Sequence, residues 1–178
     1  MEFRNHTQND SLVIESLFES VFTKSEGEAE GALISRLSKE LIAETNVYDL
    51  FGFVAIDRDQ IIASILFTRL TFPAGFASFI LAPVAVHCDH QGKGIGQGLI
   101  KHGLNALRNE GVRFVITYGD PSFYTKVGFH HISHEVIRPP FELSQPDGWL
   151  GQSLMGDSID SLTGRCSCVK ALDDSAYW

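Results

Sequence analysis

The chain has 178 residues, of which 44% are hydrophobic, 20% charged and 11% aromatic. This composition excludes intrinsic disorder and fibrous repeats, and the length fits one globular domain. The longest apolar stretches, Ile61–Phe67 and Phe76–Val86, are shorter than the roughly 20 residues of a membrane-spanning helix. The charged, polar N-terminus predicts no secretory leader, and three cysteines are too few for a disulfide framework, so we expect a cytoplasmic location.

The net charge of −8 argues against non-specific binding to nucleic acid, which requires positive charges that neutralise phosphates. Positive charge gathers in residues 91–126, where the local net charge is +3 while the rest of the chain sums to −11. Because this stretch is also glycine-rich, it is a candidate for binding an anion. Chance clustering on one helix is the alternative, and charge alone does not decide between the two.

The N-terminal part of the chain predicts a short edge strand over Met1–His6 and then two helices. The first follows the N-cap candidates Asp10 and Ser11, because apolar residues recur at i, i+3, i+4 and i+7. These residues are Ile14, Leu17, Phe18 and Val21. The polar, acidic segment Thr23–Gly31 predicts a loop or helix entry. The second helix is expected to turn Leu33, Leu37 and Leu41 inward.

From Tyr48 onward β-branched and aromatic residues predict strands. Leu50–Ile56 and Ile61–Phe72 are expected to form an antiparallel hairpin, and Ala77–Val86 a third strand. Pro83 has no N–H to donate to a sheet, so we expect a β-bulge in the strand Ala77–Val86.

After the glycine-rich residues 91–98 we expect a helix with an inward face of Leu99, Ile100, Leu104 and Leu107. Further strands are predicted over Val112–Tyr118, Phe129–Arg138 and Arg165–Leu172, with a short helix over Ser122–Val127 that ends at Gly128. The predicted fold is a single α+β domain over residues 1–178. Its central, mostly antiparallel mixed sheet would have about six to seven strands, flanked by about four helices.

The turn between the third strand and this helix is the most informative part of the sequence. Glycine occupies every second position from Gly92 to Gly98. The first N–H groups of a helix lack partners and carry the positive end of its dipole, and glycine lets a phosphate come close to them. We therefore predict that backbone amides bind a pyrophosphate without a metal. Glycines that merely permit tight packing of strand and helix are the structural alternative.

Other phosphate-binding loops fit less well. The chain has no Gly-Lys-Ser or Gly-Lys-Thr, which a P-loop requires. A dinucleotide-binding fingerprint would need its third glycine where the chain has Gln97 or Leu99, and the preceding strands are predicted to form hairpins.

Two short motifs point to a family. Gln91-Gly92-Lys93-Gly94-Ile95-Gly96 matches [RQ]-x-x-G-x-[GA], and Tyr124-Thr125-Lys126-Val127-Gly128-Phe129 matches Y-x-x-x-G-F. With these motifs and the predicted element order up to Arg138, the chain resembles the GNAT N-acetyltransferase superfamily. The segment Gly119–Tyr124 looks most like the YhbS-like branch of predicted N-acetyltransferases. Residues 139–178 would then be a family-variable C-terminal extension of the same domain.

The resemblance implies a GNAT-like fold with acetyl-CoA as co-substrate and no metal. Backbone groups of Val84, Ala85 and Val86 would pair with the pantetheine arm. The pyrophosphate would be bound by the amides of Gln91, Gly92, Lys93, Gly94, Ile95 and Gly96, with Gln97 beyond. Tyr124 would lie near the sulfur and protonate the leaving thiolate, at little cost because the reference pKa of tyrosine is about 10 and that of a thiol about 8.5. A core aromatic beside Phe123 and Phe129 is the alternative for Tyr124.

Other chemistry-bearing residues leave alternatives open. The general base is His87, Asp89, Glu26, Glu28 or a water relay, and the sequence does not choose among them. A nucleophilic Cys88 is disfavoured because no Asp–His pair accompanies it. Cys166 and Cys168 are expected to be two small buried residues on a strand, since no second pair of metal-ligand residues accompanies them.

In the superfamily that the chain resembles, the first two helices and the C-terminal strands line the acceptor pocket. Those parts contain Glu26, Glu28, Glu30, Phe141, Trp149, Tyr177 and Trp178. Because an acidic rim attracts cations, the expected partner is a small-molecule or peptide amine, with no nucleic acid and no membrane. An exposed C-terminal aromatic pair leaves a homodimer open.

The predicted function is therefore transfer of an acetyl group from acetyl-CoA to a primary amine, by direct attack in a ternary complex. A non-catalytic acyl-CoA-binding sensor or regulatory module is one alternative. A nucleotide-binding protein that uses the same loop is the other.

Overall fold

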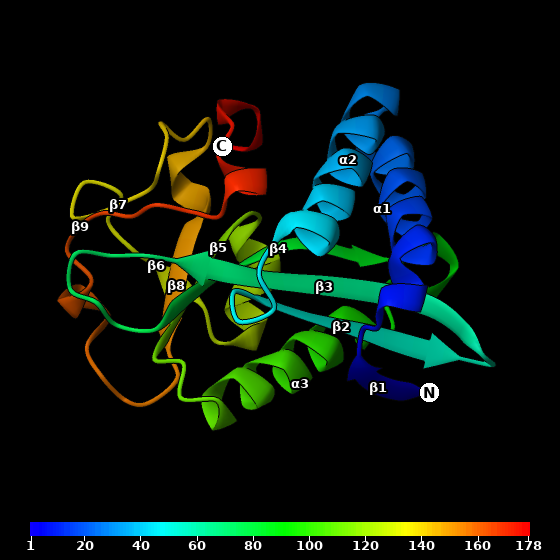
Figure 1. Cartoon of the computed structure of the whole chain (residues 1–178), viewed down its shortest axis with the longest axis horizontal. Helices are drawn as coiled ribbons and strands as arrows, with labels where there is room; N and C mark the ends of the chain where they lie inside the picture. The colour runs from blue at the N-terminus through cyan, green and yellow to red at the C-terminus, as the bar shows by residue number, and fades with distance from the viewer. The chain divides into compact units, whose positions relative to one another are not determined.

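Seven strands of the chain join in one sheet, in the order β1-β2-β3-β4-β5-β8-β6 (Figure 1). The structure is a computed structural model that describes residues 1–178. The strands are β1 (Glu2–Asn5), β2 (Leu50–Asp57), β3 (Gln60–Leu70), β4 (Ser78–Val86), β5 (Phe114–Tyr118), β6 (His130–His131), β7 (Ile137–Arg138), β8 (Trp149–Ser153) and β9 (Gly164–Arg165). The α-helices are α1 (Ser11–Glu26), α2 (Glu28–Glu44), α3 (Ile95–Asn109) and α4 (Pro121–Tyr124). The predicted α+β class, with a mixed sheet and about four helices, is confirmed.

The chain packs as two compact units. The first comprises Met1–Phe67 and Pro83–Gly103, and the second comprises Thr68–Ala82 and Leu104–Trp178. None of the helices is both long enough and apolar enough to cross a bilayer.

The first unit contains the predicted edge strand and hairpin. β1 pairs antiparallel with β2, from Glu2↔Ile56 to Asn5↔Phe53. Between β2 and β3 only Arg58 and Asp59 form the turn, both with positive φ (48° and 62°). A two-residue turn of this kind connects antiparallel strands, so the predicted hairpin is confirmed.

The first two helices form a close hairpin on one side of β2 and β3 (Figure 1). Of the loop or helix entry expected over Thr23–Gly31, the loop is wrong and the helix entry is confirmed, because only Gly27 separates α1 from α2 and Glu28 begins α2. A Cβ at Gly31 would lie 1.9 Å from Thr23 Oγ1, so glycine is what lets the two helices approach here. Glu28 and Glu30 instead occupy the first turn of α2, where the helix dipole favours negative charge.

The predicted apolar faces of these helices are largely confirmed. In α1 the buried residues are Ile14, Leu17, Phe18 and Val21, as expected. In α2 Leu37 and Leu41 are buried, but Leu33 is half-buried and Ile34 is buried beside it.

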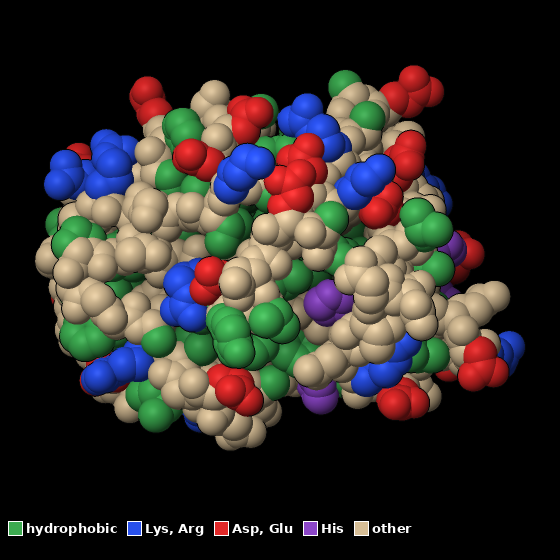
Figure 2. Space-filling model, viewed as in Figure 1, with side chains coloured by type: hydrophobic (Ala, Val, Ile, Leu, Met, Phe, Trp, Pro, Cys, Tyr) green, Lys and Arg blue, Asp and Glu red, His purple; other side chains and the backbone are tan.

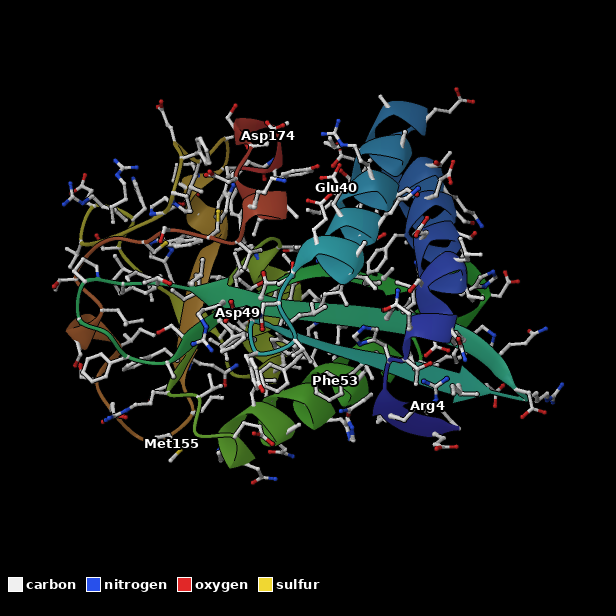
Figure 3. The ribbon with its side chains drawn as sticks, in the orientation of Figure 1. Arg4, Glu40, Asp49, Phe53, Met155 and Asp174 are labelled. Carbon is white, nitrogen blue, oxygen red and sulfur yellow. The ribbon has the colours of Figure 1, made fainter.

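The N-terminal part of α3 lies on the other side of these strands and packs closely on them. Figure 3 shows the ring of Phe53 over α3, and this ring lies 5.4 Å from that of His102. A Cβ at Gly103 would lie 2.6 Å from Phe67 Cε2, so the helix could not come this close with a larger residue. All four predicted inward residues of α3 (Leu99, Ile100, Leu104 and Leu107) are buried.

In the second unit β4 pairs parallel with β5, from Ser78↔Phe114 to Leu81↔Thr117. This pairing ends two residues before Pro83, which cannot donate a hydrogen bond. β4 nevertheless continues to Val86. The β-bulge expected in the strand Ala77–Val86 stays a prediction.

The C-terminal strands differ most from expectation. β8 was not predicted, yet it lies between β5 and β6 and pairs antiparallel with both. The single strand expected over Phe129–Arg138 is wrong: β6 ends at His131, and the chain then turns at Ser133, whose carbonyl accepts from the N–H of Ile137 at 2.8 Å.

The strand expected over Arg165–Leu172 is also wrong. β9 ends at Arg165 after pairing in parallel with β7, outside the main sheet. A single bridge from Ser167 to Thr71 follows, and Lys170–Leu172 forms a 3-10 turn. Alternating side chains predict an extended segment. Whether that segment becomes a strand depends on a pairing partner from another part of the chain, which this segment finds only at Gly164–Arg165 and Ser167.

Candidate functional site

The end of β4 presents free backbone groups along one edge. The N–H of His87, just after β4, donates to the carbonyl of Ile62 in β3 at 2.8 Å. Backbone groups of successive strand residues point to alternate sides, so those of Val84 and Val86 point away from β3 and those of Ala85 toward it. Of the three residues predicted to pair with an extended ligand, Val84 and Val86 therefore have the required orientation.

Two side chains of the following turn donate hydrogen bonds to nearby backbone carbonyls. Gln91 Nε2 donates to the Val86 carbonyl at 3.0 Å, and Lys93 Nζ donates to the Asp89 carbonyl at 2.8 Å. The backbone N–H of Gln91 is directed to the Cys88 carbonyl at 3.4 Å. The Gln91 side chain is thus engaged with the strand, and Val86 keeps only its N–H free on that edge.

Six consecutive backbone N–H groups, from Gly92 to Gln97, have no acceptor within the chain. The first helical hydrogen bond of α3 runs from Gly98 N–H to the Gly94 carbonyl at 2.9 Å. Gly92 and Gly94 have φ of 73° and 77°, while the φ of Lys93 between them is not positive. Such alternation gathers successive N–H groups around one concavity, which is a typical anion site.

The glycines of this turn divide into two kinds. A Cβ built at Gly92 or Gly94 would meet no heavy atom within 4 Å, so backbone conformation and not space requires glycine there. A Cβ at Gly98 would lie 3.1 Å from Phe3 Cζ, so tight packing explains that glycine. Tight packing of strand and helix, the alternative explanation for these glycines, therefore applies at Gly98. Gly92 and Gly94, which lie among the free amides, fit the anion-binding prediction.

Tyr124 lies at the end of α4 in the second unit. Asp120 caps this helix by accepting from the N–H of Ser122 at 2.8 Å. The Tyr124 ring meets Phe123 and Phe129 edge-on, at 5.1 and 5.8 Å between centroids. A Cβ at Gly119 would lie 2.7 Å from Tyr124 Cε2, so glycine makes room for the ring. The sequence did not identify this role of Gly119.

Burial raises the pKa of Tyr124 to about 12, although the polar Thr117 side chain lowers it in part. The phenol is therefore neutral at physiological pH and can donate a proton. The contacts with Phe123 and Phe129 show that the alternative prediction, a core aromatic side chain, also holds for the ring.

The candidates for a general base differ in their surroundings. His87 Nδ1 accepts a hydrogen bond from the N–H of Asp89 at 3.3 Å. This bond gives Nδ1 a structural role and leaves the proton of the neutral ring on Nε2. Glu26 and Glu28 are exposed at the junction of α1 and α2. Burial, with a smaller effect of Glu26, raises the pKa of Glu30, which the sequence had named only for the acceptor rim. On the face in Figure 2, acidic and basic side chains are interspersed over α1 and α2.

The C-terminal tryptophans are core residues. Trp149 is fully buried and its Nε1 donates to the Ile137 carbonyl at 2.8 Å. Trp178 is 6% exposed, and its Nε1 donates to the Leu172 carbonyl at 3.1 Å. The expectation that Trp149 lines an acceptor pocket is therefore wrong, because this side chain has no exposed surface. The exposed C-terminal aromatic pair is wrong for Trp178, which is buried, whereas Tyr177 is half-buried.

The cysteines do not form a metal site. Cys166 is buried as predicted, whereas Cys168 is half-buried, and neither belongs to a regular strand. Burial raises the pKa of Cys166 to about 12 and that of Cys168 to about 11, so neither is a thiolate near neutral pH. No group of three or more His, Cys, Asp or Glu side chains is arranged to hold a metal ion.

Comparison with known proteins places the chain in a family. Residues 48–131 match the profile of the acetyltransferase (GNAT) domain. The chain is 30% identical over 139 residues to the uncharacterized N-acetyltransferase YjhQ of Escherichia coli K12, across 75% of this chain and 76% of YjhQ. It is 26% identical over 141 residues to the uncharacterized N-acetyltransferase YhbS of the same strain, across 78% and 80% of the two chains. The chain therefore belongs to the GNAT family of N-acetyltransferases, and the resemblance inferred from its motifs is confirmed.

Solved structures share the fold. Escherichia coli YhbS in complex with CoA has a TM-score of 0.84 and 23% identity, covering 98% of this chain and 92% of YhbS. A GNAT family acetyltransferase from Brucella melitensis in complex with acetyl-CoA has a TM-score of 0.75 and 23% identity, covering 97% of each chain. The predicted GNAT-like fold is confirmed.

Proposed function

We propose that this enzyme transfers an acetyl group from acetyl-CoA to a primary amine by direct attack in a ternary complex, with Tyr124 as the general acid. The observation that carries the proposal is the run of unpaired N–H groups from Gly92 to Gln97 at the start of α3. Solved relatives of the same fold hold CoA or acetyl-CoA, which supports this choice of anion.

The amides from Gly92 to Gln97 bind the pyrophosphate of acetyl-CoA. Each hydrogen bond from an amide to a charged oxygen is worth about 1.5–3 kcal/mol, so several amides together hold the group without a metal. The pantetheine arm extends along β4 and pairs with the backbone of Val84, which leaves the N–H of Val86 for the thioester oxygen at the end of the arm. Gln91 supports this arrangement because its side chain holds the Val86 carbonyl.

The reaction needs a donor for the oxyanion and an acid for the leaving group. The free N–H of Val86 stabilises the tetrahedral oxyanion that forms when the amine attacks the thioester. Tyr124 then gives its proton to the CoA sulfur, a role worth about 10²–10⁴ in rate. With its pKa at about 12, this transfer to a thiolate of reference pKa near 8.5 costs about 5 kcal/mol, unless burial also raises the pKa of the CoA thiol. The phenol is thus a weaker acid than the reference values predicted.

The acceptor is a cationic small molecule or a peptide amine. Three carboxylates, Glu26, Glu28 and Glu30, lie at the junction of α1 and α2. They attract a protonated amine, and Glu30, whose pKa is raised, is the one best suited to take a proton from it.

Binding is tested first, by calorimetry and thermal shift with CoA, acetyl-CoA, ATP and NAD. CoA and acetyl-CoA are expected to stabilise the protein, by about 2.7 kcal/mol at 100 times their Kd. Stabilisation by ATP or NAD without CoA would contradict the proposal.

Turnover is tested by thiol release from acetyl-CoA with a panel of amines that contains diamines, aminoglycosides, amino acids and lysine peptides. At least one amine is expected to release CoA and gain an acetyl group. The variant Tyr124→Phe should bind CoA with nearly unchanged Kd but turn over about 10²–10⁴ times more slowly. Binding of CoA without acetylation of any amine would instead identify a sensor.

A further inference from the structure

The hydrogen-bond ladder between β6 and β8 stops before β8 does. β8 extends beyond its pairing with β6 and ends at Ser153 (Figure 1). The N–H of the next residue, Leu154, donates to the Arg113 carbonyl at 2.8 Å, on the β5 side of β8. Because backbone groups of successive strand residues point to alternate sides, the N–H and the carbonyl of Ser153 point to the β6 side. Continuing the β6–β8 register by two residues would place Gly128 opposite Ser153.

Gly128 does not pair with Ser153. Its φ of 92° is left-handed, so the chain leaves the strand direction at this residue. The N–H of Gly128 donates to the carbonyl of Thr125 at 3.2 Å instead. No other group of the chain takes its place, so the N–H and the carbonyl of Ser153 both lack a partner within the chain.

The side chain of Ser153 adds a third unpaired polar group. Its Oγ is buried and has no hydrogen-bond partner. Ser64 and Thr68 in β3 also have unpartnered hydroxyls, but Ser153 is the one that lines this edge pocket, whose volume is about 280 Å³. Buried polar groups are nearly always paired in folded proteins, so the three unpaired groups of one residue at a pocket are those that a ligand would satisfy.

An apolar wall lies beside Ser153 in this pocket. A Cβ built at Gly151 would lie 3.1 Å from Ile159 Cδ1 and 3.2 Å from Ile132 Cδ1, so both isoleucines cover that face of β8. Gly151 and Ser153 share the face, because they are two residues apart in the strand. Asp157 also lines the pocket, but an arginine side chain already pairs with its carboxylate. The pocket therefore combines the unpaired groups of Ser153 with an apolar surface.

The unpaired backbone groups indicate the chemical class of the ligand. The Ser153 N–H needs an acceptor, and its carbonyl needs a donor. A carboxylate offers only acceptors and an amidinium only donors, so each would leave one of the two groups unpaired. An amide offers a carbonyl and an N–H together, and the Ser153 hydroxyl, which can rotate, is able to bond to either. Strand edges bind extended peptides through the same pair of groups.

Ser153 lies at the far end of β5 from the groups that we assign to proton transfer. It is opposite Phe114, the first residue of β5, whereas Gly119, which makes room for the Tyr124 ring, follows the last residue of that strand. At roughly 3.3 Å per residue, the strand separates the two positions by about 16 Å. A ligand on Ser153 therefore occupies different space from a thioester beside Tyr124.

We propose that the pocket at the edge of β6 and β8 binds a small amide. The amide carbonyl accepts from the Ser153 N–H, the amide N–H donates to the Ser153 carbonyl, and the apolar part of the ligand lies against Ile132 and Ile159. The amide is a primary carboxamide or one residue of an extended peptide, since the pocket is smaller than those that hold drug-sized ligands. The inference does not depend on the proposed acetyl transfer.

The chemical class is tested with four probes that all carry an isopropyl group: isobutyramide, isobutyrate, isobutyramidine and N-acetylvaline N-methylamide. Each is titrated into ¹⁵N-labelled protein without acetyl-CoA, and the backbone resonance of Ser153 is followed by NMR. Isobutyramide, the blocked valine or both should move this resonance to saturation. Isobutyrate and isobutyramidine should bind about 10-fold more weakly or worse, because each leaves one backbone group unpaired.

Every outcome of this series has a defined meaning. Saturation by isobutyramide supports a carboxamide ligand, and saturation by the blocked valine alone supports a peptide. The proposal is overturned if neither amide saturates the Ser153 resonance, or if isobutyrate or isobutyramidine binds as tightly as the amides.

The contribution of the side chain is tested with Ser153→Ala. Loss of the hydroxyl should weaken binding of the better amide about 3- to 10-fold. Ser64→Ala, which removes another unpartnered serine hydroxyl, is the matched control and should leave this affinity unchanged. If Ser153→Ala does not fold, Ile159→Trp, which fills the pocket from its apolar wall, should abolish binding. An unchanged affinity in the pocket variant, or an equal loss in the control, overturns the assignment.

Addition of CoA distinguishes this pocket from the site of the proposed function. CoA should leave the amide bound to Ser153, because the two ligands occupy different ends of β5. Displacement of the amide by CoA would overturn the separate pocket. Since no step of this experiment needs turnover, a protein that fails to acetylate any amine would still test the amide pocket.

Discussion

The substitution Gly94→Ala tests the amide run most directly. Gly94 has a φ of 77°, and a Cβ there meets nothing within 4 Å, so alanine brings backbone strain without a clash. An L-residue in this region costs about 1–2 kcal/mol, part of which is offset by the lower entropy of the unfolded chain. To relieve the strain, the backbone rotates and turns neighbouring N–H groups out of the concavity.

The loss of affinity follows from the number of amides displaced. At about 1.5–3 kcal/mol per charge-assisted hydrogen bond, losing one should raise the Kd for CoA about 10- to 100-fold. The free energy of unfolding should fall by only about 1 kcal/mol. Calorimetry with CoA measures the first quantity and urea denaturation the second.

Gly75→Ala is the matched control. Gly75 has a φ of 74° and equally open surroundings, but it lies in the turn between β3 and β4. It should lose similar stability and keep its affinity for CoA. If Gly94→Ala binds CoA within twofold of Gly75→Ala, the amides at the start of α3 do not hold the pyrophosphate.

Three further variants or treatments probe other parts of the structure. Gly119→Ala should push the Tyr124 ring aside and lower kcat while the KM for acetyl-CoA stays similar; unchanged steady-state kinetics would show that the ring position is unimportant. The Arg4 guanidinium holds the pKa of Asp10 well below its usual range, so this ion pair stabilises the fold above about pH 4 and less as the pH falls further. In urea denaturation from pH 6 to pH 2.5, Asp10→Asn should therefore be less stable than the parent by about 1–2 kcal/mol at the upper end, and this difference should shrink toward the lower end, whereas parallel curves would contradict the assignment. The Cys166 thiol, with its pKa raised to about 12, should resist iodoacetamide at pH 8 until the protein unfolds, as peptide mass spectrometry would detect.

Several features of the fold follow from short stretches of sequence. The apolar spacing of Ile14, Leu17, Phe18 and Val21 predicts the buried face of α1, because a helix repeats every 3.6 residues whatever it packs against. The unpaired amides at Gly92–Gln97 are also predictable from local sequence, because the first N–H groups of any helix have no partner within it.

Contacts between distant segments were not predictable in this way. β8 pairs between β5 and β6, and the sequence around Trp149 does not say which strands will be its neighbours. Trp178 looked exposed because it ends the chain, but tertiary packing buries it against Tyr118, with 6.4 Å between the ring centroids.

The site likewise contains features set by local sequence and features set by contacts between distant segments. The sequence by itself determined the glycine-rich helix start and the tyrosine motif, because both depend on residues that are neighbours in the chain. Only the tertiary structure decided that Thr117 donates to the Leu81 carbonyl, and that Glu30 rather than Glu26 or Glu28 is the partly buried carboxylate. The hydrogen-bond partner of a buried hydroxyl and the burial of a carboxylate depend on residues that are distant in the sequence. A short stretch of sequence does not identify those residues.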